Sequence, residues 1–265
     1  MKENKIQNYR DYCDGMHKSL EDKLFFKTFL KEHSEIKNFI DFGCADGVLL
    51  EQVQKQFPAL SLYGIDQDSA MLLKANNRVP QAFYINSQFP NIAPENSVLN
   101  LSSVLHEVYS YGSEEYIREF WENIANSVFI YIFVRDMMYV ENDELLSKAE
   151  VKSLLASLEA CPSEEYVTRF FDFIYSKILT KKELVHFLLK YRYGTNWERE
   201  KREDYFSYSL EDLLQAMPDY SLIELKHYTL PFLKKQIKSD FNYDLDVPTH
   251  FHAIFKLTSK SAAIA

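Results

Sequence analysis

Residues 40–49 read IDFGCADGVL, and this segment is the clearest indication of fold in the 265-residue chain. An acidic residue, Asp41, closes an apolar run, and Gly43 and Gly47 frame a short turn that leads directly into a helical pattern. Glycine removes the side chains that keep a ligand away from the backbone, and a helix start offers unpaired N–H groups to a carboxylate. The segment therefore predicts a strand, a tight turn and a helix that approach a small ligand.

A second acidic residue, Asp66, ends the next apolar run, 19 residues after Gly47. A carboxylate at the carboxyl end of a strand can accept hydrogen bonds from ribose hydroxyls. Two acidic strand ends at this separation predict a nucleoside site. The alternative is that Gly43 and Gly47 only permit a tight turn, and that Asp66 only caps the next helix.

These residues resemble the motifs of the class I (Rossmann-like) S-adenosylmethionine-dependent methyltransferases. The first motif of that superfamily is an acidic residue followed by Gly-x-Gly-x-Gly, and the second is an acidic residue that ends the next strand. Asp41, Gly43 and Gly47 match, and Ala45 replaces the middle glycine. The alternative cofactor is a nicotinamide or flavin dinucleotide, which the carboxylate of Asp41 disfavours because it would lie close to a pyrophosphate.

The resemblance implies that S-adenosylmethionine is the cofactor, with its methionine part held by the turn 43–47 and its ribose by Asp66. The end of the third strand would then lie beside the adenine. The complete set of implied cofactor residues is Asp41, Gly43, Cys44, Ala45, Gly47, Asp66, Gln67, Asn86, Ser87 and Ser103.

Strand patterns alternate with helical patterns from residue 38 to 136, which predicts βαβ units around a parallel sheet. Strands are expected at 38–41, 61–66, 81–86, 98–105, 128–136, 221–230 and 250–257, with helices at 48–57, 68–75 and 116–124. By the resemblance, the α/β fold is a doubly wound, mostly parallel sheet of seven strands whose last strand is antiparallel. Residues 36–140 and 218–260 would form this core.

Two helical additions are expected around the core. The first 35 residues are amphipathic, and they predict a helical lid over the cofactor that includes Tyr9, Tyr12 and Met16. Simple packing of this segment against the sheet is compatible with the same pattern. Residues 141–217 show helical periodicity without a convincing strand, which predicts a helical cap between the fifth and sixth strands.

Ligands of open α/β sheets bind beyond the carboxyl ends of the strands, so the residues after the fourth and fifth strands are candidates for catalysis. We expect His106 to act as a general base, Glu107 to orient it and Tyr109 to shape the pocket. Alternatively, His106 and Glu107 only secure a loop. The candidate contacts of the acceptor are Arg135, Tyr191, Tyr193 and Trp197, although Arg135 can equally form a structural ion pair with Asp136.

The expected activity is methyl transfer to an oxygen or nitrogen atom of a small molecule or a single side chain. The net charge of −9 argues against a broad nucleic-acid-binding face. The run 190–202 interleaves cations with aromatic residues, so a methyltransferase that modifies nucleotides or RNA remains an alternative. A third hypothesis is a binding protein that keeps the fold without turnover.

The remaining features predict a cytoplasmic protein without a metal or a membrane partner. Cys13, Cys44 and Cys161 are far apart, which favours reduced, mostly buried thiols over disulfides or a zinc site. No apolar run approaches the roughly 20 residues that cross a bilayer. Residues 1–10 are too polar for a signal peptide.

Overall fold

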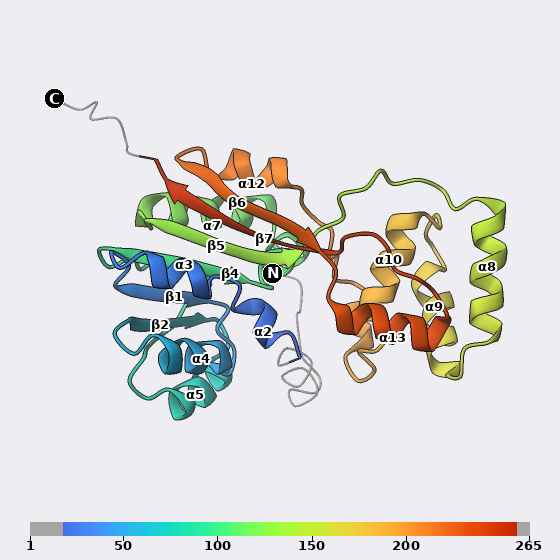
Figure 1. Cartoon of the computed structure of the whole chain (residues 1–265), viewed down its shortest axis with the longest axis horizontal. Coiled ribbons are helices and arrows are strands. Elements are labelled where there is room, and N and C mark those ends of the chain that lie inside the picture. Colours follow the sequence, from blue (N-terminus) through green and yellow to red (C-terminus); the bar gives the residue numbers. More distant parts are fainter. Residues whose placement is uncertain (1–17, 259–265) are drawn as a thin grey trace.

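The structure, a computed structural model, describes residues 18–258 and contains one seven-stranded sheet with the order β3-β2-β1-β4-β5-β7-β6 (Figure 1). The strands are β1 (Asn38–Phe42), β2 (Ser61–Asp66), β3 (Phe83–Asn86), β4 (Ser97–Ser102), β5 (Tyr131–Met137), β6 (Tyr220–Tyr228) and β7 (His250–Leu257). The first five are parallel, and β7 runs antiparallel to both β5 and β6. The predicted doubly wound sheet with an antiparallel last strand is confirmed.

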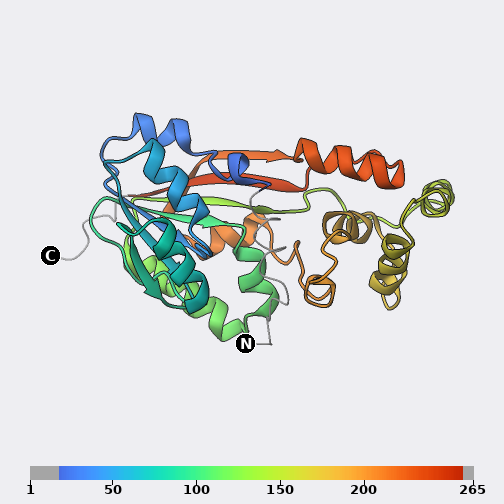
Figure 2. The ribbon, with the colours of Figure 1, turned by 90° about the horizontal axis from the view of Figure 1, so that it is seen from below.

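Helices cover both faces of the sheet, because successive strand residues point to opposite sides and both sides are apolar. On β1, Phe39 packs against one helical layer and Ile40 against the other. Figure 2 shows the sheet from its edge, with α3 and α7 on opposite sides. One layer consists of α2 (Leu20–Lys23), α3 (Lys27–Glu32), α4 (Val48–Gln56) and α5 (Ser69–Arg78), and the other of α6 (Leu105–Tyr111), α7 (Glu114–Ser127) and α12 (Leu210–Ala216).

The helical insertion between β5 and β6 forms a cap beside one end of the sheet (Figure 1). It contains α8 (Lys148–Glu159), α9 (Glu164–Ile174), α10 (Lys181–Lys190) and α11 (Trp197–Glu200). A helix between β6 and β7 that we did not predict, α13 (Pro231–Phe241), joins the same apolar cluster through Ile237 and Phe241. The cap is therefore built from two separate parts of the chain.

The predicted fourth strand is too long at its carboxyl end. β4 ends at Ser102, and Leu105 opens α6 instead of closing the strand. Ser103 turns the chain with a left-handed backbone (φ +56°), and Leu105 is then completely buried in the core. The fifth strand likewise begins at Tyr131 rather than Val128, because Val128 (φ +53°) ends α7. Side-chain hydrophobicity alone did not separate these turns from the strands.

The amino-terminal helical prediction holds for two short helices, α2 and α3, within the described residues. Leu24, Phe26 and Leu30 of this segment are buried against the sheet. Tyr9, Tyr12 and Met16, to which we gave a lid role, lie outside the described residues, as does Cys13. Cys44 and Cys161 are free thiols, and only Cys44 is fully buried. No helix within residues 18–258 has the length and hydrophobicity to span a bilayer.

Candidate active site

The glycine-containing turn after β1 has a left-handed backbone at three positions, Gly43 (φ +74°), Ala45 (φ +45°) and Gly47 (φ +77°). At Gly47 a Cβ atom would lie 2.9 Å from the Cα of Ala75, so glycine is required for α4 to pack against α5. Gly43 is exposed at the sheet edge, and a Cβ there would lie 3.0 Å from Val104. Packing between α4 and α5 thus accounts for Gly47, whereas Gly43 is exposed and its backbone N–H donates to the carbonyl oxygen of Ile65 at 2.8 Å.

Asp66 connects the turn to the loop that follows β2. Its Oδ2 accepts a hydrogen bond from the backbone N of Ala45 (2.9 Å), and its Oδ1 accepts one from the backbone N of Asp68 (2.8 Å). Asn86 donates to the carbonyl oxygens of Asp66 (3.1 Å) and Gln67 (2.9 Å). The residues that the resemblance assigns to the ribose and adenine therefore lie together at the carboxyl ends of β1, β2 and β3.

Asp41 is a buried carboxylate at the end of β1. Its Oδ1 accepts a hydrogen bond from Nδ2 of Asn100 at 2.8 Å. Burial raises the pKa of Asp41 to about 7, although the hydrogen bond from Asn100 and the charge of Lys23 oppose the shift. Lys23, which sequence reasoning missed, is buried beside it, and burial together with the charge of Arg135 lowers the pKa of Lys23 to about 8.

These residues fit an adenosyl sulfonium amino acid. Each oxygen of Asp66 accepts one backbone N–H in the structure, which leaves lone pairs for ribose hydroxyls. Asp41 offers a carboxylate for the cofactor's amino group, and the exposed backbone of Gly43 permits close approach. Ser87 is engaged locally, because its Oγ donates to the carbonyl oxygen of Phe89 at 2.9 Å.

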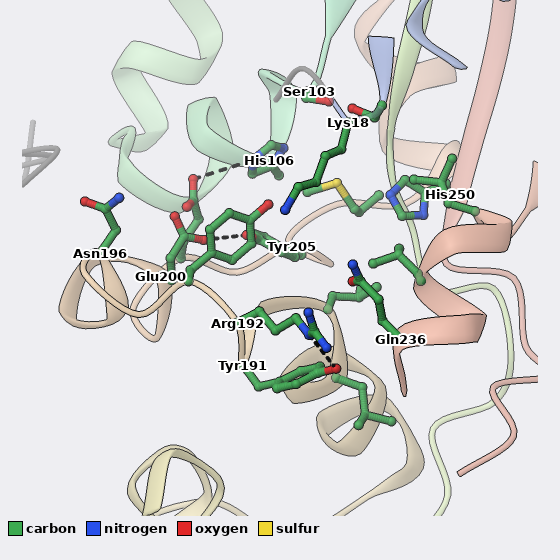
Figure 3. Close-up of a pocket in the computed structure, with 18 of the residues that line it drawn as sticks. Lys18, Ser103, His106, Tyr191, Arg192, Asn196, Glu200, Tyr205, Gln236 and His250 are labelled. Carbon is green, nitrogen blue, oxygen red and sulfur yellow. Dashed lines mark hydrogen bonds and ion pairs between the residues drawn. The ribbon is translucent and has the colours of Figure 1, made fainter. Parts of the chain in front are cut away.

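A cavity of about 420 Å³ lies between the carboxyl ends of β4 and β5, the start of α6 and the cap (Figure 3). Its wall includes six residues that the sequence singled out, which are Ser103, His106, Glu107, Arg135, Tyr191 and Tyr193. It also includes ionisable residues that we did not assign to the acceptor from the sequence, among them Lys18, Lys23, Arg192, Arg199, Glu200, Glu203 and His250. The cavity is thus partly open, and both polar and apolar side chains from the core and the cap line it.

Two candidates lie away from this cavity. The hydroxyl of Tyr109 accepts a hydrogen bond from Nε1 of Trp121 (3.0 Å), and its ring stacks on Tyr208. Trp197 is buried in the cap and donates from Nε1 to Asp172 at 2.7 Å. Neither Tyr109 nor Trp197 is part of the cavity wall.

His106 is held by Asp136, which sequence reasoning had paired with Arg135. Nδ1 of His106 lies 2.6 Å from Oδ1 of Asp136, and its backbone N donates to Oδ2 at 3.1 Å. Burial lowers the pKa of His106, but the charge and hydrogen bond of Asp136 outweigh burial and raise it to about 9. Arg135 contacts Asp22 instead, so the interpretation of Arg135 and Asp136 as an ion pair is wrong.

Glu107, which we expected to orient His106, pairs its carboxylate with Arg199 at 2.7 Å, and its charge also contributes to the raised pKa of His106. The same guanidinium contacts Glu200 (2.7 Å) and Glu203 (2.9 Å), and Glu203 also lies 3.5 Å from Nε2 of His106. Burial and the charges of Glu107 and Glu200 raise the pKa of Glu203 to about 8. We assigned no role to Glu200 or Glu203 from the sequence.

His106, Glu107 and Glu203 also have the ligand types and the proximity of a metal site, since their ligand atoms lie within 4.8 Å of one another. Imidazole and carboxylate groups bind several divalent metals. Arg199 contacts both carboxylates, however, so a cation would have to compete with an ion pair that is already formed. Arg199 is thus the counter-charge that the protein itself places at these carboxylates.

The cationic and aromatic run 190–202 points largely inward. Lys190 is completely buried and donates from Nζ to the backbone carbonyl oxygens of Glu200 (2.7 Å) and Glu203. Tyr191 and Arg199 are also buried, and Arg192 pairs with Asp240 at 2.6 Å. The run therefore does not present the row of exposed cations that phosphate contacts require.

Comparison with known proteins supports the fold. No protein-family model matches the chain. A curated relative, trans-aconitate 2-methyltransferase from Variovorax paradoxus (strain S110), is 30% identical over 93 residues, which are 35% of this chain and about a third (34%) of that protein. The plantazolicin methyltransferase BamL, solved with a desmethylPZN analog and SAH, is 13% identical with a TM-score of 0.50 over 94% of this chain and 88% of its own.

A second solved structure, the N-methyltransferase NodS from Bradyrhizobium japonicum WM9, is 10% identical, covers 96% of this chain and 99% of its own, and has a TM-score of 0.48. The sheet order, the antiparallel β7 and the likeness to BamL define the fold. The chain has the class I S-adenosylmethionine-dependent methyltransferase fold.

Proposed function

We propose that the chain is an S-adenosylmethionine-dependent methyltransferase that acts on an oxygen or nitrogen atom of a small molecule or a single side chain. The observation that carries this proposal is the partly open cavity beside the end of β4, with His106 in its wall and Asp136 behind His106. The cavity lies next to the edge where the glycine turn and Asp66 gather. This arrangement suits a cofactor and an acceptor that meet beyond the carboxyl ends of the strands.

The cofactor, when bound, supplies an electrophilic methyl group on its sulfonium. The protein's part is to hold and align the two reactants, and alignment alone can supply roughly 7 to 11 kcal/mol of the barrier. Asp66 and the backbone near Gly43 would hold the adenosyl and methionine parts. The cap and the described part of the amino-terminal segment, residues 18–35, would exclude water from the cavity, which is the role we propose for these two additions.

His106 is positioned for a role at the acceptor. Because its Nδ1 faces Asp136, the Nε2 atom is the one directed toward Glu203 and the cavity. With a pKa of about 9, the imidazole carries a proton at neutral pH. In that state it can donate a hydrogen bond to the methyl acceptor and place a positive charge beside it. It acts as a general base only after it has lost the proton.

Cofactor binding is tested by thermal unfolding with S-adenosylmethionine, S-adenosylhomocysteine and NAD. We expect both adenosyl compounds to raise the melting temperature and NAD to leave it unchanged. Asp66→Ala should abolish the shift, whereas Asp68→Ala, which removes the side-chain cap of α5, should retain it. Absence of a shift with either adenosyl compound in the folded wild-type protein would overturn the proposal.

Turnover is tested separately, by methyl transfer from labelled S-adenosylmethionine to a panel of small acceptors. Trans-aconitate, the compound in the name of the relative from Variovorax paradoxus, is a reasonable first acceptor to test. A binding protein without turnover would show the thermal shift and no labelled product with any acceptor. Labelled product that is lost in Asp66→Ala supports the enzyme.

A further inference from the structure

One corner of the cavity is formed by three cations, Lys18, Lys23 and Arg135, which we call the cationic corner. Arg135 comes from β5 and is 2% exposed, whereas Lys23 comes from α2 and is 9% exposed. Lys18 is exposed and extends into the cavity beside His106 and Tyr205 (Figure 3). The corner brings together a strand end and a helix that lie more than 100 residues apart in the chain.

The guanidinium of Arg135 is incompletely paired. Its Nη1 donates to Oγ of Ser103 and its Nε donates to Oδ2 of Asp22, both at 2.7 Å. Its Nη2 lies 2.6 Å from the same Asp22 oxygen, yet among residues 18–258 it has no acceptor in hydrogen-bonding geometry. The ion pair with Asp22 compensates the charge of this atom, and a ligand oxygen beside it would add the well-aligned hydrogen bond that the protein does not supply.

Within residues 18–258 Asp22 is the carboxylate in ion-pair contact with the corner, and the charges of Asp41 and Asp136 also act on Lys23, where they raise its pKa against the larger effect of burial. Asp22 is the carboxylate that contacts Arg135, and it also accepts a hydrogen bond from Tyr228 at 2.8 Å. Within the described part of the chain, neither Lys18 nor Lys23 forms an ion pair at 4.0 Å or less. The positive charge of Arg135 also lowers the pKa of Lys23, in addition to the larger effect of burial. An anion would relieve this repulsion.

We propose that the cationic corner binds a carboxylate of the methyl acceptor, so that the substrates are small carboxylic acids. The proposal rests on the proposed methyltransferase function. A guanidinium and an ammonium together match the two oxygens of a carboxylate, with charge-assisted hydrogen bonds. The three cations line the cavity and no residue of the turn 43–47 does, which favours the acceptor as the source of this carboxylate; because Lys23 also lies beside Asp41, the carboxylate of the cofactor is the competing occupant that the test must separate.

The test is binding of succinate to the full chain saturated with S-adenosylhomocysteine, at constant ionic strength, with the neutral succinamide as its matched control. We expect calorimetry to detect succinate and not succinamide. Lys23→Gln should weaken succinate binding at least tenfold, and the exposed Lys18→Gln should weaken it a few-fold. Arg192→Gln changes a cation in the same cavity that is paired with Asp240, so it should retain binding within twofold.

Equal binding of succinate and succinamide, or no binding of either, overturns the carboxylate proposal while the thermal shift with S-adenosylhomocysteine still supports the methyltransferase. Methylthioadenosine lacks the amino acid part of the cofactor and serves as the probe for that part. If Lys23→Gln weakens binding of S-adenosylhomocysteine while succinate and methylthioadenosine bind as tightly as to the wild type, the corner serves the cofactor and the proposal is wrong. If S-adenosylhomocysteine itself does not bind the wild-type protein, the proposed function fails first.

Discussion

The side chain of Asp136 holds His106 at two points, with Oδ1 2.6 Å from the ring Nδ1 and Oδ2 3.1 Å from the backbone N. Asp136 is completely buried at the end of β5, and Oδ1 also accepts a hydrogen bond from the backbone N of Met137 at 2.8 Å. The two hydrogen bonds from His106 to Asp136 fix the orientation of the imidazole ring at the start of α6. Asp136 is therefore a positioning residue for His106.

Replacing Asp136 with Asn should lower the pKa of His106, because burial remains while the negative charge is lost. Methyl transfer should slow by about 10- to 100-fold, with affinity for S-adenosylhomocysteine within twofold. NMR titration of the imidazole and steady-state kinetics check both parts. An unchanged imidazole pKa in Asp136→Asn would contradict the assigned contact.

The pH dependence of turnover distinguishes two roles for His106. Because its pKa is raised to about 9, the protonated form persists at neutral pH and is lost as pH rises through 9. If the imidazolium orients an acceptor that is already ionised, kcat should fall above pH 9. If His106 is a general base, kcat should rise through the same range. His106→Gln supplies the reference profile, since Asp41 and Lys23 also titrate between pH 7 and 8.

The same shift predicts a pH-dependent contribution to stability. A raised pKa means that the folded state binds the proton more tightly, so the stabilisation is complete below the unfolded value of about 6.5 and disappears as pH rises through 9. The difference in free energy of unfolding between the wild type and His106→Gln should therefore shrink from pH 6 to pH 10. Urea denaturation at four or five pH values measures it.

Asp41→Asn should stabilise the cofactor-free protein and weaken cofactor binding. Burial raises the pKa of Asp41, so ionising this carboxylate above pH 7 costs stability, and the amide still accepts from Asn100. The free energy of unfolding at pH 8 should increase by about 1 to 3 kcal/mol, less than the full shift because Lys23 loses a counter-charge. The gain should diminish as pH falls toward 4. A destabilised variant at pH 8 would contradict the burial argument.

Gly47→Ala should destabilise the fold by about 2 to 4 kcal/mol, because the left-handed backbone is strained for alanine and its Cβ would strike the backbone of Ala75. Gly194→Ala is the control. Gly194 lacks a left-handed backbone, and its Cβ would meet only the end of the Arg169 side chain at 3.0 Å. Chemical denaturation of both variants should show a large loss for the first and a small one for the second.

Arg199→Met should destabilise the junction between the cap and the core. The substitution leaves Glu107, Glu200 and Glu203 without their shared cation, and removing one partner of a buried pair costs about 3 to 5 kcal/mol. Arg118→Met removes only exposed ion pairs on α7 and should cost less than about 1 kcal/mol. Equal losses in the two variants would show that Arg199 does not hold the junction.

Local patterns were enough to predict the sheet and its cofactor edge. Asp41, Gly43, Gly47 and Asp66 each follow a strand at a position that the chain order itself specifies, so their meeting at one edge required only the parallel topology. The insertion between β5 and β6 was likewise visible, because helical periodicity is a short-range property. Turn positions such as Ser103 were missed, since a non-glycine left-handed residue leaves little trace in the sequence.

The acceptor side of the site was decided by long-range packing. His106 bonds to Asp136, 30 positions away, and Arg135 bonds to Asp22, 113 positions away, although Arg135 and Asp136 are neighbours in the chain. Adjacent strand residues point to opposite faces, so sequence proximity suggested the wrong ion pair. The placement of Glu203 against His106 depends on how the cap folds back onto α6, and no local pattern of residues encodes that contact.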